Sequence, residues 1–377
     1  MIYLDNAATT KVSKDVLHAM MPYFDEQYGN AGSTHCMGRV AKNAMEKARV
    51  QVAAPINAKP EDIIFTSCAT EANSLVFFGL VRQLTKTGNT HIIVSSIEHD
   101  SVLSCAEALR NRYGFDISVA EPDQDGIIQA KEVSRLVRDN TGLISVMTVN
   151  NELGTQNPIH EIGELCRERE ILFHTDCVQG YCNVPVDVET ENIDFLSVSG
   201  HKFHAPKGVG FLYAKRKELL LPLLAGGGQE FDLRAGTENV PYIVAIGKAA
   251  EIANSKATER FSYENMIRSF RNEIECVGGT YVNGAPYPGS KIVNIRFDGI
   301  DGETLLLLLD SQNICVSAGS ACSAHSAKPS HVLKGIGLTD LQARSSIRVS
   351  ISDDTTFEEL MIAAKEICKS VNILRGK

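Results

Sequence analysis

The sequence lacks several features that would assign the chain to a membrane, secreted or repeat class. Apolar runs such as Leu305–Leu309 are far too short to cross a bilayer. The N-terminus, Met-Ile-Tyr-Leu-Asp, has no basic segment before an apolar core, so we expect no signal peptide. No internal repeat at a solenoid period is present. We therefore expect a globular cytoplasmic protein with no membrane partner.

Basic charge is also scarce. Lys+Arg 37 against Asp+Glu 46 gives a formal net charge of −9 at pH 7, and the chain has no basic run. Nucleic-acid binding needs a basic surface, so we expect no direct nucleic-acid partner. The 10 cysteines include no Cys-x-x-Cys pair, which argues against a disulfide framework. Most should be buried thiols, and the question is whether one is catalytic.

The distribution of apolar residues predicts an α/β fold for the first two thirds of the chain. Short β-branched runs alternate with segments of helical spacing, which predicts βαβ units and a mostly parallel sheet flanked by helices. The predicted strands are Asp62–Thr66, His91–Ser96, Leu143–Asn150, Ile171–Thr175, Asp194–Ser199 and Val209–Tyr213, and the predicted helices are Glu71–Leu84, Ser101–Asn111 and Ile159–Arg169. Ligands of such sheets bind at the carboxyl ends of the strands.

The pattern changes after about Glu251. A polar helix over Ala257–Glu275 precedes short strands, and a helix near Phe357–Ile373 closes the chain. The strands predicted here are Lys291–Phe297, Ile314–Ser317 and Ser346–Ile351. A chain of 377 residues is long enough for about two domains. We expect residues 12–255 to form a large domain, and residues 1–11 with 256–377 to form a smaller α+β domain.

A lysine at the end of a predicted strand is the first candidate for chemistry. Ser199-Gly200-His201-Lys202 follows the strand Asp194–Ser199, and such a lysine can form a Schiff base with an aldehyde cofactor. The neighbouring hydroxyl and imidazole could bind the phosphate of that cofactor. Taken alone, the lysine is more simply explained as a surface residue at a strand end.

Two further segments strengthen the chemical interpretation of Lys202. Asp176 ends the strand Ile171–Thr175, and an aspartate beside a pyridine nitrogen keeps that nitrogen protonated. Thr66–Glu71 leads from a strand into a helix, where free amides and the Thr70 hydroxyl can hold a phosphate. Each has a simpler alternative, a helix N-cap for the aspartate and a capping box for the helix start. Adjacent parallel strands would bring the acid and the lysine to one edge of the sheet.

Short motifs along the chain occur in the order found in a known enzyme family. The motifs are Tyr3–Thr10, Ala69–Asn73, Glu98-His99, Asn150–Gly154, Asp176 with Gln179, Ser199–Lys202, Arg234–Thr237, Gly319–Cys322 and Ser345–Arg348. In these motifs the chain resembles the NifS/IscS-type cysteine desulfurases, which are class V aminotransferase-like enzymes of pyridoxal phosphate fold type I. The resemblance implies conversion of L-cysteine to L-alanine.

The resemblance also implies a role for each matching residue. Lys202 would carry pyridoxal 5'-phosphate as a Schiff base, Asp176 would pair with the pyridine nitrogen, and His99 would stack on the ring as an acid or base. The other cofactor ligands would be Ala69, Thr70, Ser199 and His201 at the phosphate, Asn151 and Gln179 near the phenolic oxygen, and Thr237 reaching across from the partner subunit of a homodimer. Arg348, with Asn151, would hold the substrate carboxylate. No metal site is expected.

Cys322 is the candidate nucleophile among the cysteines. It lies in a segment rich in serine, alanine and glycine, whereas Cys105 and Cys166 lie in predicted helices and Cys315 in a predicted strand. A thiol in such a loop should be exposed and can attack the sulfur of a bound cysteine. The resemblance implies that Cys322 takes up the sulfur as a persulfide and passes it to an acceptor protein. An iron–sulfur scaffold is one candidate acceptor, and tRNA thiolation is another pathway.

Some positions depart from the family pattern and leave alternatives open. Cys68 stands where glycine is usual, Phe231-Asp232 replaces Arg-Gly, and Gly29–Ser33 is closer to desulfurases associated with DNA phosphorothioation. The acceptor and the preference for cysteine over selenocysteine are therefore open. The alternatives are a phosphorothioation-associated desulfurase, a selenocysteine lyase or other class V aminotransferase, and a non-catalytic sulfur-relay scaffold. A loop thiol favours a desulfurase, because transamination needs no thiol.

Overall fold

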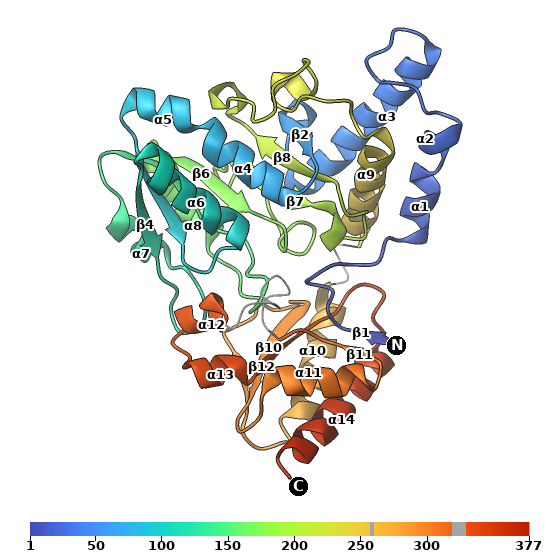
Figure 1. Ribbon diagram of the computed structural model, residues 1–377, viewed down its shortest axis with the longest axis vertical. Helices are drawn as coiled ribbons and strands as arrows, with labels where there is room; N and C mark the ends of the chain where they lie inside the picture. Colours follow the sequence, from blue (N-terminus) through green and yellow to red (C-terminus); the bar gives the residue numbers. More distant parts are fainter. Residues whose placement is uncertain (257–259, 319–328, 377) are drawn as a thin grey trace.

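The computed structural model describes residues 1–256, 260–318 and 329–376 of the chain (Figure 1). Its larger part contains a seven-stranded sheet of order β2-β8-β7-β6-β5-β3-β4. β8 is antiparallel to both of its neighbours, and the other neighbouring strands are parallel. The strands are β2 (Ile63–Thr66), β3 (His91–Ser95), β4 (Asp116–Ala120), β5 (Thr141–Ser145), β6 (Leu172–Asp176), β7 (Phe195–Ser199) and β8 (Gly210–Ala214).

Helices cover both faces of this sheet. Side chains of successive strand residues point to opposite faces, so Ile63 and Phe65 join one hydrophobic core while Ile64 joins the other. The first core includes buried residues of α1 (Lys14–Met20), α3 (Cys36–Ala53), α7 (Ala130–Leu136), α8 (Ile159–Glu168) and α9 (Val240–Ser255). The second includes α4 (Ala69–Gly79), α5 (Val81–Thr87) and α6 (Asp100–Tyr113). Because both faces are covered, the central strands β5, β6 and β7 are buried along nearly their whole length. The short helix α2 (Pro22–Asp25) follows α1.

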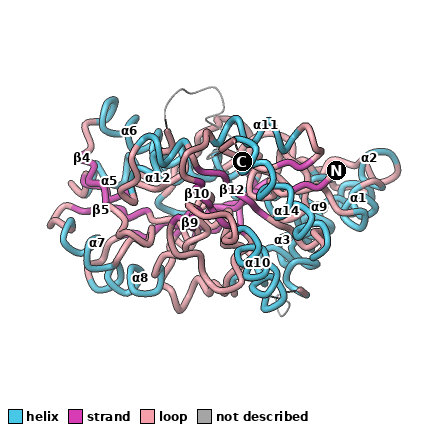
Figure 2. The backbone as a smooth tube through the Cα atoms, turned by 90° about the horizontal axis from the view of Figure 1, so that it is seen from below, coloured by secondary structure: helices cyan, strands magenta, loops and turns pink. Residues whose placement is uncertain are grey.

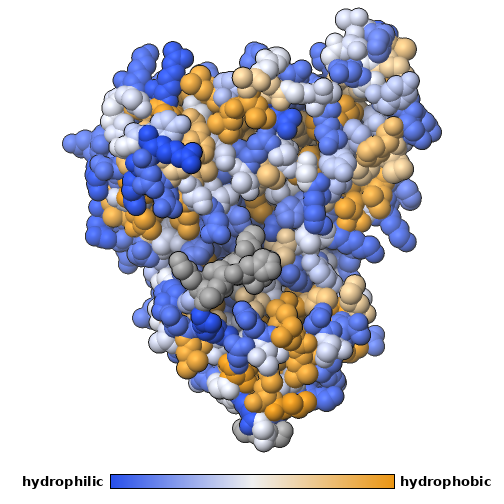
Figure 3. Space-filling view, viewed as in Figure 1, coloured by the Kyte–Doolittle hydropathy of each residue, from blue (hydrophilic) through white to orange (hydrophobic). Residues whose placement is uncertain are grey.

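A smaller part has its own sheets (Figures 1 and 2) and a hydrophobic core of its own. β9 (Thr280–Asn283), β10 (Ile292–Phe297) and β12 (Ser346–Ser350) form an antiparallel sheet, and β1 (Ile2–Tyr3) pairs in parallel with β11 (Ile314–Cys315). Their core also includes residues of α10 (Arg260–Ile274), α11 (Gly302–Asp310) and α14 (Phe357–Leu374). Leu4 is wholly buried in this core, so the start of the chain packs with its end. Figure 3 shows apolar side chains gathered on the surface of this part.

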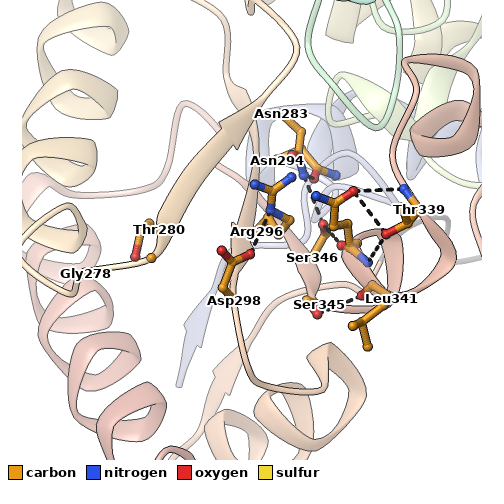
Figure 4. Close-up of polar contacts among 12 residues, drawn as sticks. Gly278, Thr280, Asn283, Asn294, Arg296, Asp298, Thr339, Leu341, Ser345 and Ser346 are labelled. Carbon is orange, nitrogen blue, oxygen red and sulfur yellow. Dashed lines mark hydrogen bonds and ion pairs between the residues drawn. The ribbon is translucent and has the colours of Figure 1, made fainter.

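Two short helices and a chain of hydrogen bonds connect the parts. α12 (His331–Gly335) and α13 (Asp340–Arg344) follow in sequence after β11, yet their buried residues join a core of the larger part. Asn283 Nδ2 donates to Asn294 Oδ1 at 2.7 Å and to Ser346 Oγ at 3.0 Å (Figure 4). Asn294 Nδ2 in turn donates to the Glu152 carbonyl at 3.4 Å. The small sheet is thereby fixed against a loop of the larger part.

The predicted fold class, an α/β fold with a mostly parallel sheet flanked by helices, is confirmed. Most predicted strands agree with the structure to within a residue or two. The strand Leu143–Asn150 was predicted too long: β5 ends at Ser145, and the next residues leave the sheet. The edge strand β4 was not predicted. No helix in the described residues has both the length and the apolar composition of a bilayer-spanning segment.

The predicted helix Glu71–Leu84 is two helices in the structure. α4 ends at Gly79, and α5 begins at Val81. The Gly79 carbonyl accepts a hydrogen bond from the Leu221 N–H at 3.0 Å, and a Cβ atom on Gly79 would lie 3.0 Å from the backbone oxygen of Leu221, so glycine suits this close approach. The end of α4 is therefore set by a contact with a distant segment, which the helical spacing of the sequence does not show.

Candidate active site

A cavity of about 260 Å³ opens where β6 and β7 end. It brings together most of the predicted site residues, from both parts of the chain. Those that line it are Ala69, Thr70, His99, Asn151, Asp176, Gln179, Ser199, His201, Lys202 and Arg348. Thr237 is exposed and does not line the cavity in this chain. Cys322 lies outside the described residues.

Lys202 reaches the cavity from the end of β7. The strand ends at Ser199, and a single turn of 3-10 helix over Gly200–Lys202 directs the chain away from the sheet. Lys202 Nζ donates hydrogen bonds to the carbonyls of Ala7 at 2.5 Å and Ala8 at 3.0 Å. The N-terminal segment therefore holds the amine at the cavity wall.

Asp176 is the last residue of β6, which lies beside β7 in parallel. Its carboxylate is 4% exposed and accepts hydrogen bonds from Asn73 Nδ2 at 2.9 Å and from the Val178 N–H at 3.0 Å. Asn73 also donates to Ser101 Oγ at 2.9 Å. Asn73 therefore orients the acid. Its contact with Asp176 was not predicted, although Asn73 lies in one of the motifs.

Glu98 is a second buried acid close to the site, and no role for it is expected from the sequence. Burial, followed by the charge of Asp176, raises the pKa of Glu98 to about 8. Its Oε1 accepts a hydrogen bond from the Met147 N–H at 2.6 Å. The carboxyl group is therefore protonated at neutral pH. The next residue, His99, is the N-cap of α6, and its Nδ1 accepts a hydrogen bond from the Ser101 N–H at 3.1 Å.

The start of α4 lines one end of the cavity, and an anion would bind at this end. Ala69 and Thr70 lie in the first turn of the helix, whose N–H groups have no acceptor within the helix. Burial, followed by the charges of Lys202 and Lys207, lowers the pKa of His201 to about 4, so this imidazole is neutral at pH 7. The capping-box alternative is wrong, because the N-cap is Cys68 and its side chain makes no capping hydrogen bond.

Arg348 lies in the middle of β12 and is 1% exposed. Its Nη2 donates to Asp5 Oδ1 at 2.7 Å, and its Nη1 donates to the Asn151 carbonyl at 2.9 Å. Its Nε is buried and has no hydrogen-bond partner among the described residues. Arg348 lines the cavity, and a guanidinium at a cavity wall is suited to binding a carboxylate.

The described residues on either side of segment 319–328, which contains Cys322, contact the walls of this site. Ser317 pairs with Arg348 through two backbone hydrogen bonds of 3.1 and 2.6 Å. Ser330 Oγ donates to Glu152 Oε2 at 2.6 Å, and Glu152 is 1% exposed. Both ends of the segment are therefore anchored to residues next to the cavity.

The comparison with known proteins identifies the family. The sequence model of the family described as Aminotransferase class-V matches residues 2–362. The chain belongs to this family. Within the family, the cysteine desulfurase IscS of Methanosarcina thermophila is 41% identical over 379 residues, which cover 100% of this chain and 93% of that protein. The predicted resemblance to cysteine desulfurases is confirmed.

Solved structures of similar proteins have the same fold. A NifS-like protein superposes with a TM-score of 0.92 at 34% identity, over 99% of this chain and 100% of that one. A structure described as SspA in complex with cysteine gives a TM-score of 0.82 at 38% identity, over 93% of this chain and 99% of that one. Both alignments cover nearly the whole chain, so the similarity is not limited to one domain.

The cofactor of this class-V chain is pyridoxal 5'-phosphate, and the cavity fits it. Asp176 provides an acid for the ring nitrogen, and Lys202 provides an amine for the aldehyde. The first turn of α4, with Ser199 and His201, provides donors for the phosphate. These groups occupy one cavity, as a bound cofactor of this chemistry requires.

Proposed function

We propose that the chain is a cysteine desulfurase that converts L-cysteine to L-alanine and transfers the sulfur to Cys322. One observation carries the proposal: a single cavity joins Lys202, Asp176 and Arg348, so an amine, an acid and a guanidinium meet there. An amino acid whose carboxylate bound Arg348 would have its Cα close to the amine of Lys202 and to a cofactor ring paired with Asp176. The name of the SspA complex, which contains cysteine, supports the choice of substrate.

Each residue of the site has a separate role in the first half of the reaction. When bound, pyridoxal phosphate supplies an electron sink for negative charge at the Cα of the substrate. Asp176 holds a proton at the ring nitrogen, and Asn73 keeps its carboxylate oriented. Lys202 removes the proton from Cα, and His99 is placed to exchange a further proton. Arg348 fixes the carboxylate of the substrate.

Cys322 performs the sulfur transfer in this proposal. Its thiolate attacks the sulfur of the bound substrate, the bond between Cβ and that sulfur breaks, and a persulfide forms on Cys322. The electron pair of the broken bond stays with the substrate carbon, which takes up a proton and leaves as alanine. The anchoring of Ser317 and Ser330 next to the cavity supports this role, since it keeps both ends of the segment near the substrate.

We propose that the persulfide sulfur then passes to an acceptor protein. This partner would act in iron–sulfur cluster assembly or in another sulfur-using pathway. We further propose a homodimer in which Thr237 of one subunit reaches the cofactor phosphate of the other. Thr237 is exposed in the single chain, which supports this arrangement. Sedimentation of the cofactor-loaded protein should give a dimer, and a fully active monomer would refute the shared site.

Two further expectations remain proposals. We propose a cytoplasmic location, supported by the nine cysteines of the described residues, all of which are free thiols. We also propose a division into residues 12–255 and residues 1–11 with 256–377. The burial of Leu4 in the core of the smaller part supports the assignment of the N-terminus to that part.

The products formed from L-cysteine test the reaction. The protein is loaded with pyridoxal phosphate and incubated with L-cysteine and dithiothreitol, and alanine, sulfide and pyruvate are measured. We expect equal amounts of alanine and sulfide without pyruvate, and none from Lys202→Ala. Pyruvate as the main product would instead show elimination, and the desulfurase proposal would then be wrong.

A further inference from the structure

Two cysteines far apart in the sequence bring their sulfur atoms together on the surface of the smaller part. Cys276 follows α10, Cys368 lies in α14, and their Sγ atoms are 4.0 Å apart. Cys276 is exposed and Cys368 is half-buried. Neither residue lines the cavity or has a role in the proposed reaction.

Packing between the two helices keeps the sulfurs close together. Phe270 and Ile274 of α10 share a buried core with Ile367 and Val371 of α14. The thiol of Cys368 also donates to the carbonyl of Glu273 at 3.6 Å, which ties α14 to the last turn of α10. The proximity of the pair is therefore a property of the folded domain core.

The geometry favours bond formation between the sulfurs over metal binding. A disulfide bond is about 2 Å long, so one sulfur must move by about 2 Å. Cys276 lies in the exposed turn after α10, where a rotation of its side chain is open to it. A structural metal site needs about four ligands, and no group of three or more His, Cys, Asp or Glu side chains suited to a metal occurs among the described residues.

The two thiols differ in reactivity. Burial, followed by the proximity of Cys276, raises the pKa of Cys368 to about 12. The half-buried thiol therefore stays protonated, and the exposed thiol meets solutes first. This asymmetry resembles a pair in which one sulfur attacks and the other resolves the adduct.

We propose that Cys276 and Cys368 form a dithiol that small disulfides oxidise to an intramolecular disulfide. The Cys276 thiolate attacks one sulfur of the small disulfide, whose S–S bond breaks and releases one thiolate. With Cys276 held in the mixed disulfide, its charge no longer raises the pKa of Cys368, so the Cys368 thiol loses its proton to solvent more readily and attacks the Cys276 sulfur, which releases the second thiolate. Two protein thiols are oxidised, and the small disulfide is reduced to two thiols. The new bond would link both ends of a chain segment that includes Cys322.

Peptide mapping after treatment with glutathione disulfide tests this reaction on the cofactor-loaded protein. Free thiols are then blocked by alkylation, and the protein is digested without reduction. We expect a cross-linked peptide pair containing Cys276 and Cys368, a loss of two titratable thiols from this pair, and a higher Tm because the bond restricts the unfolded chain. Reduction with dithiothreitol should reverse all three changes.

Single variants separate the two steps. Cys368→Ser should stop at a stable glutathione adduct on Cys276, and Cys276→Ser should yield neither the adduct nor the cross-link at these positions. Cys36→Ser, which removes another exposed thiol, is the matched control and should cross-link like the wild type. The proposal is overturned if the wild type accumulates the adduct on Cys276 without the cross-link, or if neither cysteine reacts.

Discussion

Arg348 and Asp5 form an ion pair with an Nη2–Oδ1 distance of 2.7 Å, although 343 residues separate them in the sequence. The pair joins the N-terminal segment to the centre of β12 at the wall of the cavity. Asp5 occupies one side of the guanidinium, and the buried Nε is left without a partner among the described residues. Asp5 therefore orients Arg348 and also reduces the positive charge that a substrate carboxylate meets.

Arg348→Lys should raise KM for L-cysteine. Lysine lacks the planar fork of donors, so at least one charge-assisted hydrogen bond to the carboxylate is lost. Such a bond contributes about 1.5–3 kcal/mol, which corresponds to a KM increase of about tenfold or more. Initial rates of alanine formation over a range of L-cysteine concentrations measure the effect. An unchanged KM would show that Arg348 does not bind the substrate.

Asp5→Asn is the companion to this experiment and should act in the opposite direction. The amide oxygen can still accept the hydrogen bond from Arg348, but the competing negative charge is gone. We expect KM for L-cysteine to fall, because the guanidinium then attracts the substrate carboxylate more strongly. A rise in KM would mean that orientation of Arg348 by Asp5 outweighs the charge that it removes.

Glu98→Gln should abolish a pH dependence of stability. Burial and Asp176 raise the pKa of Glu98 to about 8, from the value of 4.5 expected in the unfolded chain. Between these pH values the folded state keeps a proton that the unfolded state releases, so the free energy of unfolding falls as pH rises. Glutamine has a similar shape without charge, and it can still accept the hydrogen bond from Met147.

Urea unfolding at pH 5.5 and 7.5 measures this effect in both proteins. From pH 5.5 to pH 7.5, the free energy of unfolding of Glu98→Gln should rise by about 2–3 kcal/mol relative to that of the wild type, at about 1.4 kcal/mol per pH unit. Glu189→Gln, which alters an exposed carboxylate, should show no such gain. Equal pH dependence in the wild type and Glu98→Gln would show that Glu98 is ionised in the folded protein.

Glu230→Gln should destabilise the larger part of the chain. Glu230 forms two hydrogen bonds with Arg49, at 2.9 and 2.8 Å, and accepts a third from the Phe65 N–H at 2.7 Å. Both side chains of the pair are 3% exposed, so the substitution leaves the buried guanidinium with only the more distant, exposed carboxylate of Glu46 at 3.4 Å. Breaking such a pair costs about 3–5 kcal/mol.

Thermal and urea unfolding measure this loss of stability. Glu189→Gln again serves as the control, since its partner Lys215 is on the surface and the pair should contribute little. A Glu230→Gln variant as stable as the wild type would show that the buried ion pair is dispensable.

The sequence predicted those parts of the site that depend on local pattern and sheet geometry. Lys202 and Asp176 were placed together because each follows an apolar strand, and parallel strands end at the same edge. The strand ends were predictable for the same reason: β-branched runs and their polar boundaries are local features. The structure places both residues at one cavity.

Contacts between distant segments were not predictable in this way. The bond from Asn73 to Asp176, the pair of Arg348 with Asp5, and the burial of Glu98 all depend on how segments far apart in the sequence pack together. The division of the predicted helix at Gly79 has the same origin, because it follows from a contact with Leu221. Periodicity along the chain shows which face a helix buries, but not which residue it meets there.

The most direct test of the proposed function is a single turnover of L-cysteine without reductant, followed by mass mapping of persulfides. The wild type should form alanine together with one persulfide per site at Cys322. Cys322→Ser should keep the visible absorbance of the bound cofactor but form neither alanine nor a persulfide, and Cys315→Ser, a control in β11, should react like the wild type. Alanine formation by Cys322→Ser at the wild-type rate would contradict the proposed sulfur transfer.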